Sequence, residues 1–169
     1  FHLLGLAVFD VVEAEQVQEA VHHEVLQMVR RWNGKIGGFA VAFNPVTIVY
    51  DKRKASKPVT SWKDIWNPEW KGRVAWPSYP GAQGTAGLLM AAKVWGGDEK
   101  NIDAAFGKIR ELKPFAAIQG SQDQLYGMFD NQVGAASVEF GSFTRTYAES
   151  RNPNIVIADP TEGQAVAMN

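Results

Sequence analysis

The sequence contains no cysteine, which excludes disulfide bonds, thiolate metal sites and cysteine nucleophiles. It also lacks an excess of either charge, since 17 Lys and Arg residues against 18 Asp and Glu residues give a formal net charge of −1. Nucleic-acid binding calls for a basic face, so this balance argues against a nucleic-acid partner. No apolar run reaches the ~18 residues that a membrane-spanning helix needs. The absence of cysteine is compatible with an oxidising compartment.

The remaining composition is that of an ordinary globular protein. Of its 169 residues, 46% are hydrophobic and 21% are charged, which is enough for one domain or two small ones. The chain opens at Phe1 directly into apolar sequence, and its last residues, GQAVAMN, are apolar and strand-like. No signal peptide is visible. We therefore expect the chain to be an internal part of a longer protein.

Predicted strands alternate with single predicted helices along the chain. Apolar residues at helical spacing indicate a helix near 15–32, after a strand near 4–12. A long apolar strand follows over 39–51, interrupted at Asn44-Pro45. Further strands are expected at 73–76, 115–118, 133–138 and 155–158, with helices after Thr85, over 102–112, from Ser121 and up to Ser150. This order predicts an α/β layered fold with a mostly parallel sheet.

Residues 58–77, PVTSWKDIWNPEWKGRVAWP, contain four of the six tryptophans. Ser61 is a predicted helix cap, with Asp64 at the position of a capping-box acid. Asn67-Pro68 ends this short helix, because a residue before proline is disfavoured in the helical region. Gly72 then gives the backbone the freedom to enter a strand.

Three loops are candidates for a binding site. In open α/β sheets, ligands bind outside the carboxyl ends of the strands, where loops lead into helices. This rule selects the predicted loops 77–85, 119–121 and 139–142.

In motif order and spacing the chain resembles the periplasmic solute-binding proteins of bacterial ABC importers, most closely the spermidine/putrescine-binding branch. The segment 58–77 is similar to that family's P-T-S-W-x-D-L-W-x-P-x-x-K-G-K-V motif almost position by position. FDVVEAEQVQEAV, FAVAFNPVTIVYDK, KVWGGDEKNIDAAFGKIRELKP and NIVIADPTEGQA resemble its other elements.

The resemblance implies a type II periplasmic-binding-protein fold, an α/β architecture with a parallel-rich sheet and flanking helices. Residues 52–150 would form one complete lobe, and residues 1–51 and 151–169 part of the other, which a further chain could complete. The implied function is capture of a small solute and its delivery to an ABC permease in the inner membrane. The implied location is periplasmic, or extracellular and lipid-anchored in a Gram-positive host.

The loop 78–85, SYPGAQGT, supplies the first candidate ligand-binding residues: Ser78, Tyr79 and Thr85. With the N–H groups near Gly84, they could hold a polar ligand group at a helix N-terminus. The alternative is a plain turn with Thr85 as the helix cap. No lysine follows Gly84, so the loop is not a phosphate-binding P-loop.

The other candidates lie at strand ends. Glu139 and Phe140 suit an ammonium group, because a carboxylate accepts charge-assisted hydrogen bonds and a ring face attracts cations. The alternative is a solvated acid beside a core phenylalanine. Trp76 could complete an aromatic box with Tyr79 or belong to the core. Gln119 and Ser121 are ligand candidates too, with a simple helix cap as the alternative. The ligand favoured by these residues is a polyamine or an amino-acid-like zwitterion such as a γ-amino acid.

Neither a metal, a cofactor nor catalysis is predicted. His22 and His23 lack a second histidine at zinc-protease spacing, and the four tyrosines are not adjacent as in iron-binding relatives. No nucleophile elbow or Ser–His–Asp set is present, and Glu162 is expected to shape the hinge between the lobes. Two rival functions remain open on this fold: an effector-binding domain of a transcription regulator, and an enzyme.

Overall fold

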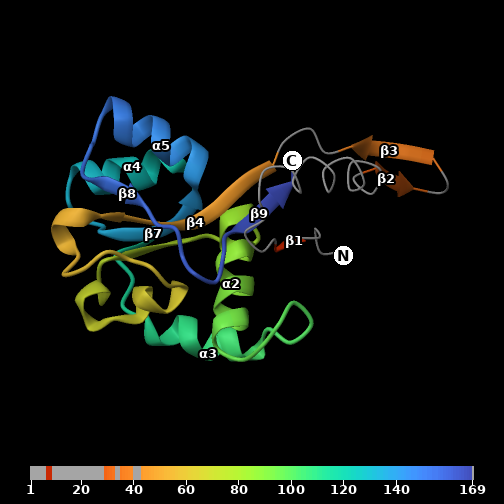
Figure 1. The fold of residues 1–169 in the computed structure, drawn as a ribbon, viewed down its shortest axis with the longest axis horizontal. Coiled ribbons are helices and arrows are strands. Elements are labelled where there is room, and N and C mark those ends of the chain that lie inside the picture. The colour runs from red at the N-terminus through yellow and green to blue at the C-terminus, as the bar shows by residue number, and fades with distance from the viewer. Residues whose placement is uncertain (1–6, 9–28, 33–34, 40–42, 169) are drawn as a thin grey trace.

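The computed structural model describes residues 7–8, 29–32, 35–39 and 43–168. Within these residues, seven strands form one mixed sheet with helices on both faces (Figure 1). The predicted α/β fold class with flanking helices is confirmed.

The sheet has a parallel part and an antiparallel part. β5 (Val74–Pro77) lies between β6 (Ala117–Gln119) and β7 (Ala136–Phe140) and is parallel to both. β7 also pairs antiparallel with β4 (Phe43–Asp51). Two further strands, β8 (Ile155–Ile157) and β9 (Ala165–Met168), pair antiparallel with β4, and β1 (Ala7–Val8) pairs antiparallel with β9. A separate two-stranded antiparallel sheet consists of β2 (Val29–Trp32) and β3 (Lys35–Phe39).

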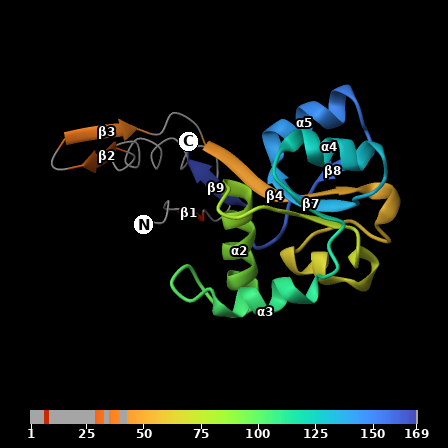
Figure 2. The ribbon, with the colours of Figure 1, turned by 180° about the vertical axis from the view of Figure 1, so that it is seen from behind.

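Helices cover the two faces of the sheet with separate apolar clusters. α4 (Gln122–Asp130) and α5 (Gly141–Ser150) lie on one side, whereas α2 (Ala82–Val94) and α3 (Asp103–Glu111) lie on the other, as Figure 2 shows from behind. The α4–α5 side buries Ala75 of β5 against Leu125, Phe129 and Tyr147. The α2 side buries Trp76, Val138, Ala86 and Met90. Neighbouring residues of β5 therefore face opposite layers, as strand geometry requires.

The tryptophan-rich segment adopts the predicted capped turn. The 3₁₀ helix η2 (Trp62–Trp66) begins after Ser61, and a capping box joins Ser61 and Asp64. Asn67 is extended, so the helix ends before Pro68 as predicted. Trp62 and Ile65 are buried against the α2 side of the sheet, which explains why the segment is so rich in large apolar residues.

The helix predicted over 15–32 is wrong at its carboxyl end. Val29–Trp32 is strand β2, which pairs antiparallel with β3. The sequence between the two strands, Asn33-Gly34, is typical of a two-residue hairpin turn, and this local preference competes with the helical spacing. Residues 9–28 lie outside the described residues. Of the strand predicted near 4–12, only β1 is described.

The interruption predicted at Asn44-Pro45 is also wrong. β4 continues through both residues, with Asn44 opposite Ala167 and Pro45 opposite Val166 of β9. Proline removes only one donor from a ladder, so pairing on either side of it maintains the strand.

Two helices begin earlier than predicted. α2 begins at Ala82 with Gly81 as its N-cap, so Thr85 lies in the first turn and is not the cap. α5 begins at Gly141, directly after β7, so the loop predicted at 139–142 is absent. The strand predicted over 133–138 corresponds to β7, which ends two residues later than predicted, at Phe140. These shifts bring helix first turns close to the strand ends.

Candidate ligand-binding site

The carboxyl ends of the three parallel strands meet at one edge of the sheet. Pro77 of β5 lies opposite Gln119 of β6, and Ala75 lies opposite Ser137, two residues before Glu139 of β7. The N–H of Ser78 donates to the Gln119 carbonyl oxygen at 2.8 Å, which continues the pairing one step beyond β5. Each strand leads into a helix, so three helix N-termini adjoin this edge. The edge is therefore where a ligand is expected on this fold.

Glu139 is the central side chain of this edge and has no exposed surface. Its Oε1 atom accepts hydrogen bonds from Nε2 of Gln83 at 2.9 Å and from the N–H of Phe140 at 2.8 Å. Nε2 of Gln122 donates to the same oxygen at 3.4 Å. Gln83 is in the first turn of α2 and Gln122 begins α4, so the carboxylate joins the two helices at the end of β7.

The other carboxylate oxygen of Glu139 is left without a partner. Among the described residues, Oε2 is buried and receives no hydrogen bond. The ion pairs of the same residues involve Asp51, Asp64, Glu111 and Asp130, not Glu139. A buried charge without a cation is costly, and here only the hydrogen bonds to Oε1 and the adjacent helix N-termini offset it. The alternative of a solvated strand-end acid is therefore wrong.

Further polar atoms without partners are buried near this edge. Within the described part of the chain they include the hydroxyls of Tyr126 and Thr144 and Nε2 of Gln119. Tyr126 lies one turn beyond Gln122 on α4. Burial raises the pKa of Tyr126, the neighbouring Thr144 hydroxyl lowers it, and the charge of Glu139 raises it. The hydroxyls of Tyr126 and Thr144 lie close enough to interact with each other, so the atoms that protein groups leave unsatisfied at this edge are on Gln119 and Glu139, which is unusual for a buried region.

The hydroxyl candidates differ in availability. Ser78 is partly exposed. The Thr85 hydroxyl donates to the Pro80 carbonyl at 3.4 Å, within its own loop and helix turn. The Ser121 hydroxyl accepts from the N–H of Gln124 and so caps α4, which is the capping interpretation. Thr85 and Ser121 therefore both have structural roles.

The aromatic candidates lie in different environments. Trp76 is 7% exposed, stacks on Phe115 with ring centroids 6.2 Å apart, and so belongs to the core. Tyr79, in contrast, is 65% exposed. Phe140 is buried, and the ring of Phe143 packs edge-on against it at 5.7 Å. Phe143 is itself 47% exposed in the first turn of α5.

Sequence reasoning missed Gln83, Gln122 and Phe143. All three lie in helix first turns that follow parallel strands, a position that the strand-end rule includes once the helix starts are known. Gln83 and Phe143 were missed because α2 was predicted to begin four residues late and α5 after a loop, whereas Gln122 was missed although the start of α4 after Ser121 was predicted correctly.

Glu162, the predicted hinge residue, is held by the tryptophan-rich segment. Its carboxylate accepts from the Ser61 hydroxyl at 2.5 Å and from the N–H of Trp62 at 3.2 Å. Burial alone would raise the pKa of Glu162, but these hydrogen bonds outweigh it and hold that pKa below its ordinary value. The indole N–H of Trp62 also donates to the Gly163 carbonyl at 2.8 Å. The connection between β8 and β9 is thus fixed to η2.

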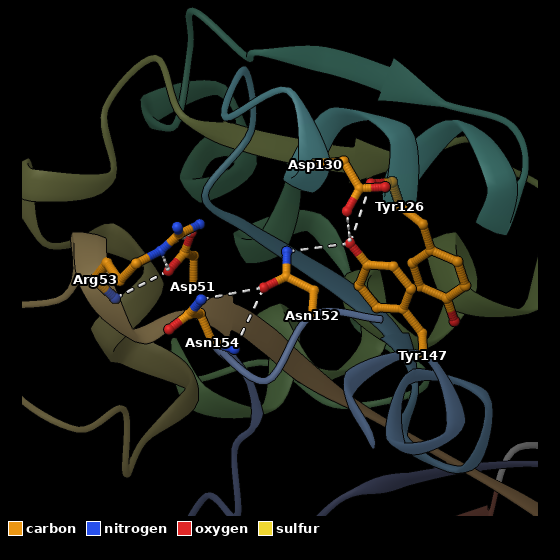
Figure 3. A network of polar contacts seen from close by, with 7 residues as sticks. All are labelled: Asp51, Arg53, Tyr126, Asp130, Tyr147, Asn152 and Asn154. Atoms are coloured by element: carbon orange, nitrogen blue, oxygen red, sulfur yellow. Dashed lines mark hydrogen bonds and ion pairs between the residues drawn. The ribbon is translucent and has the colours of Figure 1, made fainter. Parts of the chain in front are cut away.

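A second polar network lies at the opposite edge of the parallel strands (Figure 3). The Tyr147 hydroxyl donates to Asp130 at 2.7 Å and accepts from Asn152 at 3.3 Å. The rings of Tyr147 and Tyr126 stack with centroids 4.1 Å apart. This network joins α4, α5 and the loop before β8 and satisfies the Tyr147 hydroxyl, so we assign it a structural role. No three acidic or histidine side chains gather as a metal site among the described residues.

The chain belongs to the family of bacterial extracellular solute-binding proteins, since that family's model matches residues 7–168. The curated proteins compared with the chain gave no match. The described helices include none that is both long and apolar enough to cross a membrane.

Solved structures support the same fold. The chain is similar to an ABC transporter protein from Clostridium perfringens, with 26% identity, a TM-score of 0.71, and coverage of 96% of this chain and 52% of that one. The spermidine/putrescine ABC transporter substrate-binding protein PotD from Streptococcus pneumoniae is 18% identical, with a TM-score of 0.60 and coverage of 96% and 51%. A periplasmic thiamin-binding protein is also 18% identical, with a TM-score of 0.61 and coverage of 90% and 50%. The chain therefore spans about half the length of these proteins.

At these identities, PotD and the thiamin-binding protein support the fold alone. Membership of the solute-binding family is confirmed, and the narrower spermidine/putrescine branch stays a prediction. The division into lobes at residues 1–51, 52–150 and 151–169 also stays a prediction.

Proposed function

We propose that the protein is the solute-binding component of an ABC transporter and captures a small organic solute that carries an amine. The observation that carries the ligand class is Glu139, a fully buried carboxylate at the carboxyl edge of the parallel strands with one oxygen unpartnered among the described residues. A protonated amine bound at this edge brings the positive charge that this carboxylate lacks.

The surroundings of Glu139 also favour a cation over an anion. No Lys or Arg occurs between positions 74 and 92, the stretch that contains β5, its loop and the start of α2. The exposed rings of Tyr79 and Phe143 lie on the segments that follow β5 and β7. Such rings attract an ammonium group by about 0.5–2 kcal/mol. A polyamine and an amino-acid-like zwitterion both fit these features.

The proposed mechanism is closure of two lobes around the solute. Residues 52–150 form one lobe, and residues 1–51 and 151–169 contribute to the other. The lobes rotate about the crossing strands near Asn44–Tyr50 and the segment 138–159. A ligand drives closure only to the extent that it binds the closed form better than the open form. The closed protein then docks on a membrane permease from the periplasmic or extracellular side and releases the solute unchanged.

The relatives support this proposal at the level of the transport class. The names of two similar structures refer to spermidine/putrescine and to thiamin, so proteins of this architecture take different organic solutes. The choice of an amine for this chain therefore rests on its own residues.

The test is a thermal-shift screen of the full-length protein against polyamines, γ-amino acids, sugars and oxyanions. We expect stabilisation by amine-bearing solutes, since a ligand that binds only the folded state adds about 2.7 kcal/mol at a hundredfold excess over its Kd. Stabilisation by sugars or oxyanions alone would contradict the ligand class. Turnover of the bound solute to a new product would contradict a pure binding function.

The substitution Glu139→Gln tests whether the charge of Glu139 contributes to amine binding. Loss of this charge is expected to weaken amine binding by about 10- to 100-fold, the range for a hydrogen bond to a charged group. Glu149→Gln is the control, because Glu149 is an exposed acid on α5 and the chemical change is the same. Equal amine affinity in the two variants would remove Glu139 from the site.

A further inference from the structure

We propose that the ligand contacts the amide groups of Gln83 and Gln122, and that Glu139 acts as the residue that orients them. In this arrangement the amide carbonyl oxygens, and not the carboxylate, accept hydrogen bonds from the ligand's N–H groups. The inference rests on the proposed function, because it takes the ligand to be an amine, and it names the residues that select that amine.

Burial of Glu139 is the first observation. The side chain has no exposed surface, so a ligand cannot touch its carboxylate in this structure. Both glutamines are only partly buried, and both donate to Glu139. The two amides are therefore groups that bond to the carboxylate and belong to side chains with accessible surface.

The chemistry of the carboxylate fixes which way each amide faces. An ionised carboxylate has no hydrogen to donate and only accepts, so each glutamine must turn its Nε2 group towards it. Nε2 of Gln83 is 2.9 Å and Nε2 of Gln122 is 3.4 Å from the same oxygen, Oε1. In a planar amide the carbonyl oxygen then points away from Glu139. The orientation thus follows from charge as well as from the coordinates.

The two outward oxygens are available to a ligand. Among the described residues, no donor is bonded to Oε1 of Gln83 or of Gln122, and neither oxygen is one of the buried unpartnered atoms. Because both amides donate to one carboxylate oxygen, a single small molecule can reach both. The surface at this edge therefore presents two carbonyl acceptors, and the amides that carry them are hydrogen-bonded to the buried carboxylate of Glu139.

This surface selects N–H donors. The carboxylate polarises each amide through its hydrogen bond, which makes the outer carbonyl oxygen a better acceptor. An ammonium group gains from both oxygens, whereas a carboxylate or phosphate would meet two acceptors and remain unpaired. Selectivity for amines would thus come from neutral side chains that the charge of Glu139 holds in place.

The binding test replaces both glutamines by methionine, which preserves length but has no amide. We expect Gln83→Met with Gln122→Met in the full-length protein to lower affinity for the probe putrescine by about 10- to 100-fold, measured by calorimetry. Gln124→Leu is the control, since Gln124 is an exposed glutamine of the same helix turn whose oxygen accepts from the Gly120 N–H. If the ligand met Glu139 directly, the double variant would retain its affinity within about twofold, and that result would overturn the proposal.

A ligand-free measurement separates this proposal from the proposed function. In ¹⁵N spectra of the full-length protein, the side-chain NH₂ signals of Gln83 and Gln122 should be resolved and protected from exchange, unlike those of exposed Gln132. Both signals should move to the position of exposed glutamines in Glu139→Met, which has no oxygen to accept from them. Wild-type signals already at that position would overturn the orientation. If no amine bound the wild-type protein, the ligand contact would fail together with the amine function, while these signals would still decide the orientation.

Discussion

At the scale of single residues, Tyr147 shows how a buried polar group is stabilised away from the candidate binding site (Figure 3). Burial raises the pKa of Tyr147, and its hydrogen bond to Asp130 raises it further, to about 12. An unfolded tyrosine ionises near pH ~10. The contribution of Tyr147 to folding is therefore complete below pH ~10 and is lost as the pH rises through about 12.

We expect Tyr147→Phe to remove this alkaline dependence. Near neutral pH the variant should lose about 1–2 kcal/mol of unfolding free energy, because Asp130 and Asn152 lose their shared hydroxyl. Denaturant unfolding at a series of pH values measures both effects. Tyr79→Phe is the matched control, since Tyr79 is exposed and should leave the profile unchanged. Identical alkaline profiles for the two variants would show that Tyr147 does not contribute.

At the scale of elements, the packing of α2 against the end of β5 depends on Gly84. A Cβ atom at this position would overlap the Ser78 carbonyl oxygen and lie 2.9 Å from the Ser78 carbonyl carbon. The loop after β5 therefore packs directly against the first turn of α2. This contact keeps Gln83 near Glu139.

Gly84→Ala should destabilise the protein in spite of the helix propensity that alanine adds. The overlap is with backbone, which cannot move without shifting the loop, and we expect a loss of about 1–3 kcal/mol. Gly107→Ala is the control, because Gly107 lies in α3 with nothing within 4 Å of an added Cβ. That variant should gain about 0.5–1 kcal/mol. Thermal unfolding that gives the two variants the same sign would contradict the close contact at Gly84.

The elements also show what can be predicted from a sequence and what cannot. The cap at Ser61 and Asp64 and the start of α4 after Ser121 follow from the residues within one helical turn, so local rules were sufficient. The start of α2 was missed because glycine disfavours helices, so Gly84 did not indicate one. Glycine is required at this position because the loop after β5 packs directly against it, and this contact is not visible in the local sequence. The interaction of Gln83, Gln122 and Glu139 joins three separate elements, which no local pattern encodes.

At the scale of the whole molecule, two segments determine how any lobe movement could occur. β4 is a continuous strand that pairs with β7 and β8 along one part and with β9 along the other. The connection between β8 and β9 is fixed to η2 by Glu162 and Trp62. Both segments are therefore held firmly by elements within residues 52–150, the proposed lobe. Bending would then be confined to the parts of these segments that lead away from it.

Closure should be visible in the dimensions of the full-length protein. If the solute binds between the lobes, a saturating amine should lower the radius of gyration measured by small-angle X-ray scattering, because the closed form is favoured by the difference in affinity between the two forms. Glu139→Gln should show no decrease at the same amine concentration, and Glu149→Gln should match the wild type. Calorimetric binding of the amine without any change in scattering would show that the solute is held by one lobe alone. A clamp mechanism would then be wrong for this protein even though it binds a solute.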